Sequence, residues 1–329
     1  MPSAVKRIGV LTSGGDAPGM NATIRAVVRT AQCHGIDCIG VYRGYAGLMR
    51  GDFKQLREID VKGITGLGGT VLYTARSEEF ATPEGKKLAA ERCKHAGIEG
   101  LVVIGGDGSL TGARDLAKEG VKIVGIPCTI DNDIGCTSYS IGFDTACNTA
   151  VEAVDRLNDT MRAHDRCAVV EVMGRRAGYL ALSVGIAVGA TITLIPEVEV
   201  DFEENVIERI RLAKLAGRRS FTVVVAEGIE PAHVVAEKIY EATGLETRVT
   251  TLGHVQRGGS PLVRDRVIAT KMGFRAVELL AEGKTGRVIA MNGDDCVDYE
   301  INEALSMTKE FDYDIYKMFN QLTFLDRHV

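Results

Sequence analysis

The chain has 329 residues, of which 45% are hydrophobic and 25% are charged, and its formal net charge is −5. A chain of this size and composition buries a sizeable core and ordinarily forms two domains. The acidic balance argues against a general nucleic-acid or membrane-surface binder, because such proteins present a basic field. Anionic ligands would therefore need local arginines.

The eight cysteines are scattered without a CxxC pair, and several lie in strand-like or helix-like runs. This distribution is typical of reduced core thiols in a cytosolic protein. We find neither an N-terminal apolar segment of the signal-peptide kind nor an apolar run of membrane length. We therefore expect a soluble, cytoplasmic protein.

The chain starts with a strand at 7–12, a glycine turn at 13–19 and a helix at about 20–32. A helix N-terminus that faces such a turn attracts anions, so the turn is a candidate phosphate cradle. It does not fit GxGxxG, which counts against a dinucleotide fold. A second strand is expected at 37–43, and RGYAGL at 43–48 is interpreted as the turn after it.

Residues 101–133 carry the strongest local pattern. A buried strand at 101–104 ends at Gly105-Gly106, where the backbone can approach a ligand closely. Asp107 projects from this turn, and Ser109 can cap the helix that follows. A lone carboxylate beside a helix N-terminus suits a magnesium ion better than a phosphate, so Asp107 is the candidate metal ligand.

The next strand, at 121–126, leads to the acidic loop Asp131-Asn132-Asp133. In an open parallel sheet the carboxyl ends of the strands form the ligand crevice, so both acidic turns should face it. Neighbouring carboxylates push their pKa values apart and can divide base and metal duties. The alternative is an Asx-type surface turn, which is the commoner outcome for an isolated Asp-Asn-Asp.

The second half repeats the alternation of strands and helices, which implies an α/β protein with largely parallel sheets. Asp144 is expected to cap a long helix at 144–164. The other expected elements are strands at 167–172, 191–195, 221–226, 286–291 and 297–301, helices at about 203–217 and 262–281, and a C-terminal helical stretch.

Four arginines lie at or near expected strand ends, which is hard to explain as a solubilising surface: Arg166, Arg175, Arg248 and Arg257. Arg175 stands in MGR directly after a strand, and a second strand ends at Glu227. Arg257 lies in HVQRGGSP, which we interpret as a loop because it is too rich in glycine for a strand and is stopped by proline. Arginine suits phosphate binding because its planar fork pairs with two oxygens.

Together these motifs resemble the ATP-dependent 6-phosphofructokinase family. TSGGDAPGMNA, GGDGS, PCTIDND, MGR and HVQRGG occur in the family's order and span nearly the whole chain. GGDGS alone is weak, since NAD kinases and lipid kinases carry a similar turn, whereas TIDND is much more specific. The resemblance implies a glycolytic kinase that transfers the γ-phosphoryl of ATP to O1 of fructose 6-phosphate.

The resemblance also implies two similar three-layer α/β domains with the active site in the cleft between them. The ATP-binding domain would comprise 1–141 plus about 256–308, and the fructose 6-phosphate-binding domain 142–255 plus about 309–329. It further implies a homotetramer, in which Arg166 and Arg248 act across a subunit interface.

The roles of individual residues follow from the same resemblance. Asp131 would be the general base, Thr129 and Asp133 would help place the sugar hydroxyl, and Arg175 with Arg76 would balance the developing charge. ATP would be bound, with Mg²⁺ on Asp107, by Gly15, Arg76, Gly105, Gly106, Asp107, Gly108 and Ser109. Fructose 6-phosphate would be bound by Thr129, Asp131, Arg166, Met173, Gly174, Arg175, Glu227, Arg248, His254 and Arg257.

Two alternatives stay open on the same scaffold. Pyrophosphate-dependent relatives place Asp after GGD and Lys before TIDND, where this chain has Gly108 and Cys128. Glycine leaves room for ATP, but Cys128 is not the glycine common in ATP users. A non-catalytic sugar-phosphate sensor would have lost the acid-base and metal positions, and these are present. MGR together with HVQRGG argues against an NAD or lipid kinase.

Regulation is the remaining question. Arg25, Arg29 and Arg218 resemble residues that hold an allosteric nucleotide or phosphoenolpyruvate, although an isolated pair such as Arg25 and Arg29 is by default a solvated helix face. The chain departs from the effector pattern at Glu58, Asn158 and Thr191. We therefore expect blunted activation by ADP.

Overall fold

The computed structural model describes residues 3–323, and the chain divides into two compact units built from discontinuous segments. Unit 1 takes in the described residues through Ile130, then Ile134–Thr145 and Arg257–Lys309. Unit 2 takes in Asp131–Asp133, Ala146–Gln256 and the described residues from Glu310 onward. No helix within 3–323 is long and apolar enough to cross a membrane.

Unit 1 is built on a seven-stranded sheet in the order β11-β10-β5-β4-β1-β2-β3. Neighbouring strands are parallel except in the β2–β3 and β10–β11 pairs. The strands are β1 (Arg7–Ser13), β2 (Asp37–Val41), β3 (Phe53–Leu56), β4 (Gly100–Gly105), β5 (Lys122–Pro127), β10 (Arg287–Asn292) and β11 (Asp295–Glu300). The strands β1 and β4 are buried except at Arg7, the first residue of β1, which explains why their sequences are mostly apolar.

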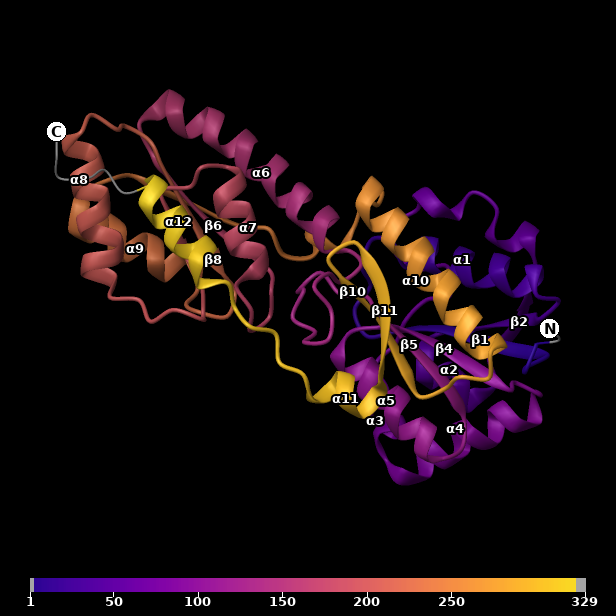
Figure 1. Ribbon diagram of the computed structural model, residues 1–329. Coiled ribbons are helices and arrows are strands. Elements are labelled where there is room, and N and C mark those ends of the chain that lie inside the picture. Colours follow the sequence, from indigo (N-terminus) through magenta and orange to yellow (C-terminus); the bar gives the residue numbers. More distant parts are fainter. Residues whose placement is uncertain (1–2, 324–329) are drawn as a thin grey trace. The chain divides into compact units, whose positions relative to one another are not determined.

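Helices cover both faces of this sheet. On one face α1 (Met20–Cys33) and α10 (Val263–Ala281) lie side by side (Figure 1). The core of the other face includes Leu48, Phe80 and Leu116. Burying one such side chain stabilises the fold by about 1.5–3 kcal/mol. The elements on this face are α2 (Gly44–Arg50), α3 (Glu78–Ala81), α4 (Pro83–His95), α5 (Asp107–Lys118) and α11 (Ile301–Ser306).

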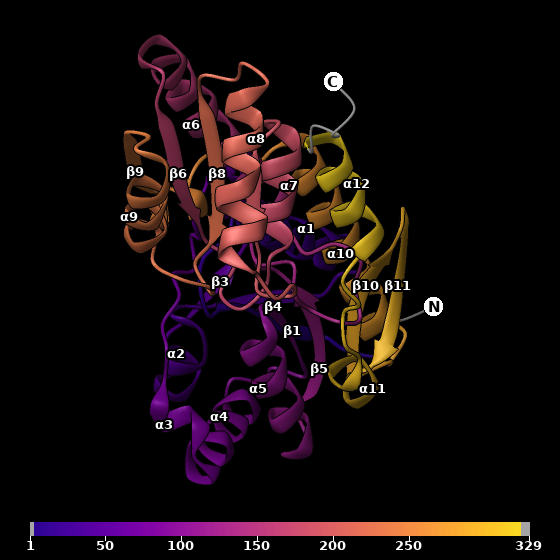
Figure 2. The ribbon, with the colours of Figure 1, turned by 90° about the vertical axis from the view of Figure 1, so that its left-hand side faces the viewer.

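Unit 2 has a four-stranded parallel sheet in the order β7-β8-β6-β9, of which Figure 2 labels β8, β6 and β9. Its strands are β6 (Cys167–Val172), β7 (Ile192–Leu194), β8 (Phe221–Ala226) and β9 (Thr247–Thr251). One face packs on α9 (Ala232–Thr243) and on a helical segment formed by a π-helical turn (Glu203–Glu208) and α8 (Arg209–Leu215). The remaining helices are α6 (Phe143–His164), α7 (Tyr179–Ala187) and α12 (Tyr313–Thr323).

A buried carboxylate holds the loop after β5 in unit 1. Asp265 on α10 is 0% exposed and accepts hydrogen bonds from the amides of Gly142 and Thr145, and from the hydroxyls of Tyr139 and Thr145. Burial raises the pKa of Asp265, and these hydrogen bonds act to lower it. Since the two amides belong to the start of α6, Asp265 caps that helix from a distant part of the chain.

The sequence prediction of an α/β protein with largely parallel sheets is confirmed. Four local predictions were wrong. RGYAGL forms the helix α2 instead of a turn, and Asp144 is the second residue of α6 while Asp265 does the capping. Ser109 does not cap α5, because that helix already begins at Asp107. Part of HVQRGGSP is a short 3₁₀ helix (Gly253–Arg257) rather than an open loop.

Candidate active site

Three parallel strands of unit 1 end at the same edge. Ser13 at the end of β1 pairs with Gly105 at the end of β4, and Gly105 pairs with Pro127 at the end of β5. The first glycine turn, the start of α5 and the residues after β5 therefore emerge next to one another. A Cβ built on Gly106 would lie 3.7 Å from Cβ of Thr129, so Thr129 is beside the second glycine turn.

Glycine is required at Gly105, whereas at Gly15 the flexible end of a side chain occupies the space that a Cβ would take. A Cβ on Gly105 would lie 2.4 Å from the backbone oxygen of Ser13 and 2.6 Å from Oγ of Ser109. A Cβ on Gly15 would lie 2.1 Å from Nη1 of Arg257. The same Nη1 donates a hydrogen bond to the Asp16 carbonyl at 3.3 Å. Arg257 therefore packs directly over the first glycine turn.

The first turn of α5 presents an open helix N-terminus. The amides of Ser109 and Leu110 donate to the Gly106 carbonyl, whereas those of Asp107 and Gly108 precede the first such bond. The helix dipole makes this end favourable for an anion. Asp107 is the first residue of the helix and is exposed, and a Cβ built on Gly108 would meet nothing within 4 Å. Ser109 is buried behind them, 5% exposed.

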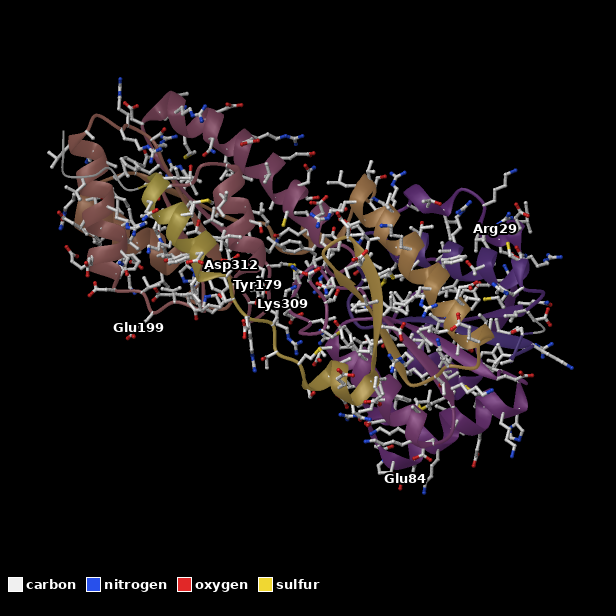
Figure 3. The ribbon with its side chains drawn as sticks, in the orientation of Figure 1. Arg29, Glu84, Tyr179, Glu199, Lys309 and Asp312 are labelled. Atoms are coloured by element: carbon white, nitrogen blue, oxygen red, sulfur yellow. The ribbon has the colours of Figure 1, made fainter. Side chains whose placement is uncertain are left out.

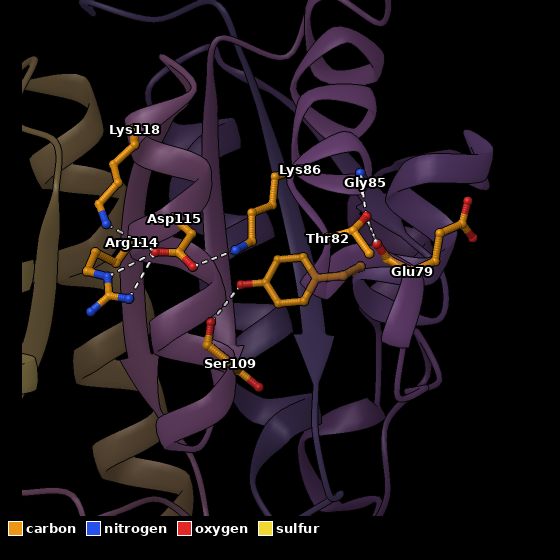
Figure 4. Close-up of polar contacts among 9 residues, drawn as sticks. Glu79, Thr82, Gly85, Lys86, Ser109, Arg114, Asp115 and Lys118 are labelled. Atoms are coloured by element: carbon orange, nitrogen blue, oxygen red, sulfur yellow. Dashed lines mark hydrogen bonds and ion pairs between the residues drawn. The ribbon is translucent and has the colours of Figure 1, made fainter.

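Tyr45 holds this turn from behind, and it was not a predicted site residue. Its hydroxyl donates to the Ser109 carbonyl at 2.6 Å, the contact drawn to Ser109 in Figure 4. Its ring stacks on Phe80 with the ring centroids 3.9 Å apart. A Cβ on Gly112 would lie 2.9 Å from the Tyr45 ring and 3.0 Å from that of Phe80, so α5 packs tightly against the pair. Sequence pattern gave no signal, because the contact joins α2 to α5.

An ion-pair cluster fixes the later part of α5 (Figure 4). Asp115 pairs with Lys86 of α4 at 2.8 Å, with Arg114 at 2.9 Å and with Lys118 at 3.3 Å. Although partial burial acts to raise it, these hydrogen bonds lower the pKa of Asp115 to about 2. Above that pH the carboxylate stays ionised and ties α4 to α5.

The segment that carries Arg76 lies along the first glycine turn. Thr74 Oγ1 donates to the Gly14 carbonyl at 2.7 Å, and the Tyr73 carbonyl accepts from Thr12 Oγ1 at 2.9 Å. Arg76, two residues beyond Thr74, is exposed. The structure therefore brings the segment of Arg76 beside the glycine turn, with the guanidinium accessible.

In unit 2 a second group of predicted residues lies at the carboxyl edge of its sheet. Val172 pairs with Ala226 at the ends of β6 and β8, so MGR and Glu227 follow neighbouring strands. The Arg175 amide donates to Glu227 Oε1 at 2.6 Å. Arg175 has φ 60°, a left-handed conformation that is uncommon for a non-glycine residue, and its side chain is exposed.

Gln256 supports this edge and was also missed. Its Oε1 accepts from the Met173 amide at 3.3 Å, and its Nε2 donates to the Gly253 carbonyl at 3.0 Å. The side chain is 0% exposed, so it joins the MGR turn to the 3₁₀ helix that carries the exposed His254. The available signal was the glutamine within HVQRGG, which was read only for its histidine and arginine.

Arg166 and Arg248 do not join Arg175. Arg166 precedes the first residue of β6, and Arg248 is the second residue of β9, so both lie at the amino edge of the sheet. Arg175 lies beyond the carboxyl end of β6. A strand of this length spans about 20 Å, so one chain cannot offer all three guanidiniums to one small ligand.

The acidic loop belongs to unit 2 through Asp131–Asp133. Asp131 is 9% exposed and Asn132 is 7% exposed, and Asn132 has φ 52°. Left-handed backbone at a non-glycine residue is uncommon, and Asn tolerates it better than most residues. The loop is therefore a buried, constrained turn, and the alternative of an ordinary exposed Asx turn is not what the structure shows.

The residues expected to bind an effector lie outside the turns described above: Arg25 and Arg29 are on α1, and Arg218 is between α8 and β8. Arg29, labelled in Figure 3, forms an ion pair with Glu58, while Arg25 on the same helix is half-buried. Arg218 donates to Thr191 Oγ1 at 3.3 Å. Arg218 also lines a cavity of about 590 Å³ in unit 2, with Ile186, Gly189, Ala216, Gly217, Phe319, Leu322 and Thr323.

Parallel sheets with glycine turns, a helix N-terminus and arginines at their edges are typical of α/β proteins that bind phosphorylated ligands. Residues 7–280 match the phosphofructokinase family. The chain belongs to the phosphofructokinase family.

Two relatives illustrate how closely the whole chain follows that family. The ATP-dependent 6-phosphofructokinase of Bacillus cytotoxicus is 52% identical over 319 residues, which are 97% of this chain and 100% of that protein. The ATP-dependent 6-phosphofructokinase of Halalkalibacterium halodurans is 50% identical over the same shares of both chains.

Solved structures agree in fold. Phosphofructokinase from Saccharomyces cerevisiae superposes with a TM-score of 0.90 and 37% identity over 96% of this chain, which spans 50% of the yeast chain. A pyrophosphate-dependent phosphofructokinase from Marinobacter aquaeolei has a TM-score of 0.82 at 21% identity over 94% of this chain and 86% of that one. At that identity the likeness to the Marinobacter protein concerns the fold alone.

The glycine contacts make a testable prediction. Gly105→Ala should destabilise the protein by about 1–3 kcal/mol, because its methyl group would overlap the Ser13 carbonyl. Gly108→Ala, three residues later in the first turn of α5, is the control, since its methyl group meets open space, and it should be neutral or slightly stabilising. Denaturant unfolding measures both, and equal stability of the two variants would contradict the packing described.

Proposed function

We propose that this protein transfers the γ-phosphoryl group of ATP to the 1-hydroxyl of D-fructose 6-phosphate, giving fructose 1,6-bisphosphate and ADP. The observation that carries the proposal is the 52% identity to an ATP-dependent 6-phosphofructokinase over 97% of the chain. Asp107, Asp131 and Arg175 are all present in the motifs of that family. The reaction is a step of glycolysis, and we place it in the cytoplasm, which suits the eight free cysteines.

Unit 1 is the proposed ATP-binding domain, corresponding to 1–141 and about 256–308. Its two glycine turns and the N-terminus of α5 offer backbone amides to an anion, which supports binding of the ATP phosphates there. Arg76, exposed beside the first turn, would neutralise phosphate charge. The proposed ATP-binding residues are Gly15, Arg76, Gly105, Gly106, Asp107, Gly108 and Ser109.

A magnesium ion is the implied cofactor, and Asp107 is the residue that would hold it. Among residues 3–323 there is no group of three or more His, Cys, Asp or Glu suited to a metal ion. An exposed lone carboxylate at a helix N-terminus fits Mg²⁺, which is usually bound by one or two carboxylates together with substrate phosphates. Bound magnesium would supply neutralisation of the nucleotide charge.

Unit 2 is the proposed fructose 6-phosphate-binding domain, corresponding to 142–255 and about 309–329. Glu227 has four lone-pair sites, of which the Arg175 amide uses one, so it can accept from sugar hydroxyls. The proposed sugar-phosphate residues are Thr129, Asp131, Arg166, Met173, Gly174, Arg175, Glu227, Arg248, His254 and Arg257.

The proposed reaction is direct in-line transfer. Asp131 accepts the proton of the C1 hydroxyl while the C1 oxygen forms its bond to the γ-phosphorus. The bond from that phosphorus to the β,γ-bridging oxygen breaks, and ADP leaves with its electron pair. Thr129 and Asp133 place the hydroxyl, and Arg175 with Arg76 balances the charge that develops.

We propose a homotetramer in which Arg166 and Arg248 serve the sugar site of a neighbouring subunit. Their location at the amino edge of the sheet, opposite Arg175 and Glu227, supports this. A second copy of the chain can bring its amino-edge arginines to a carboxyl-edge site. The site would then be incomplete in a single subunit.

Donor exchange tests the proposed activity. With fructose 6-phosphate as acceptor, we expect turnover with Mg-ATP and none with Mg-pyrophosphate, because Gly108 leaves open space where pyrophosphate users carry Asp. Initial rates of fructose 1,6-bisphosphate formation measure both. Turnover with pyrophosphate and none with ATP would show that pyrophosphate is the phosphoryl donor, which would contradict the proposal.

The assigned base makes a second prediction. Asp131→Asn should lower kcat by about 10²–10⁴-fold, since an amide cannot take the hydroxyl proton. Equilibrium binding of fructose 6-phosphate should largely survive. Asp155→Asn, at an exposed position on α6, is the control and should leave kcat unchanged. Unchanged turnover in the Asp131 variant would exclude it as the base.

We also propose that an effector phosphate is bound by Arg25, Arg29 and Arg218. Arg29 is paired with Glu58 within the same chain, so part of its charge is already compensated. Thr191 meets Arg218 through a neutral hydroxyl, and Asn158 accepts a hydrogen bond from Thr222. Less positive charge is therefore available to bind a nucleotide or phosphoenolpyruvate than three unpaired arginines would provide.

Activation by ADP should accordingly be weak. We expect ADP to shift the half-saturating fructose 6-phosphate concentration less than twofold in the wild type. Glu58→Gln should strengthen the response, because Arg29 is then free to bind phosphate. Saturation curves with and without ADP measure this, and a strong shift in the wild type would show the regulatory proposal to be mistaken.

A further inference from the structure

One carboxylate joins the two arginines at the amino edge of unit 2. Cys167 pairs with Thr247, which sets Arg166 and Glu246 opposite each other just before β6 and β9. The Cys167 amide donates to the Glu246 carbonyl at 3.0 Å and fixes this register. Because side chains alternate along a strand, Glu246 and Arg248 project to the same side.

Each oxygen of Glu246 holds one guanidinium. Arg166 Nε donates to Oε2 at 2.8 Å, and Arg248 Nη2 donates to Oε1. The hydrogen bond from Arg166 and the charges of both arginines lower the pKa of Glu246. The glutamate therefore stays ionised at neutral pH and bridges the pair.

The ion pairs with Glu246 leave hydrogen-bond donors of Arg166 available for a ligand. Glu246 engages Arg166 at Nε, and within residues 3–323 the terminal Nη1 and Nη2 of Arg166 have no side-chain partner. Those two nitrogens form a fork that matches two oxygens of a phosphate. Two guanidiniums and one carboxylate carry a net charge of +1 by simple addition, so the group still attracts an anion.

We propose that Glu246 is a positioning residue for fructose 6-phosphate, which presets the spacing of Arg166 and Arg248 before the 6-phosphate of a neighbouring subunit's substrate binds. This inference rests on the proposed function. Long arginine side chains lose rotamer freedom on binding a ligand, and a fixed partner removes part of that cost beforehand. The glutamate acts through the two arginines and touches no reacting atom.

The test is Glu246→Gln in the full-length enzyme. We expect the half-saturating fructose 6-phosphate concentration to rise roughly three- to tenfold, because the neutral amide holds two guanidiniums poorly. The kcat should stay within about twofold and KM for Mg-ATP should not change, as for loss of uniform substrate binding. Glu246→Asp, which keeps the charge, should recover part of the loss.

A second background separates positioning from general stability. In an Arg166→Ala enzyme, Glu246→Gln should again raise the half-saturating fructose 6-phosphate concentration, but by a factor less than half of that in the wild-type background. The reason is that the effects of substituting two residues in contact are not additive. Glu241→Gln on α9, an exposed glutamate nearby in the sequence, is the control and should leave all parameters unchanged.

The outcomes are distinct. If Arg166→Ala weakens fructose 6-phosphate binding but Glu246→Gln leaves it unchanged or tightens it, the positioning role is overturned. An equal effect of Glu246→Gln in both backgrounds would overturn it as well. A wild-type enzyme without fructose 6-phosphate kinase activity would instead reject the proposed function.

Discussion

The approach of two backbones at Ser13 and Gly105 is the constraint on which the glycine-turn edge of unit 1 depends. Parallel pairing of β1 with β4 brings the strand ends together, and only the absence of a Cβ lets both turns exist at that spacing. Arg257 then covers Gly15, while Tyr45 supports the carbonyl of Ser109 from the other side. Each turn alone would be weak evidence for phosphate binding, but together their adjacent backbones form one surface that could offer amides to a phosphate.

Unit 2 distributes its charge along the sheet rather than around one point. Arg175 and Glu227 share the carboxyl edge, whereas Arg166, Glu246 and Arg248 share the amino edge. Although the formal net charge of the chain is −5, arginines thus lie at both edges of this sheet, where a cationic group favours an anionic ligand. With this distribution, the proposed sugar site needs arginines from a second copy of the chain, so it forms only when copies associate.

The elements that sequence predicts well are those that are almost entirely buried. In β1, β4, β6 and β8 only Arg7 and Glu171 are partly exposed, the residues are mostly apolar, and the turns follow at once. Failures come where tertiary contacts override local preference. RGYAGL is helical although glycine favours turns. Asp144 does not cap α6, because Asp265 accepts the Thr145 amide from 120 residues further along the chain. Likewise Arg257 meets Asp16 across 241 residues, and no local pattern predicts such a contact.

The route of the chain has a consequence for biosynthesis. The sheet of unit 2 is complete once β9 ends at Thr251, but unit 1 still lacks α10, β10 and β11, which extend to Glu300. Asp265, which closes the start of α6, also arrives late. On the ribosome the inserted sheet is therefore ready to fold before its host, whose exposed β5 edge must await β10. A chain released before residue 287 would retain that unpaired edge, a template for aggregation.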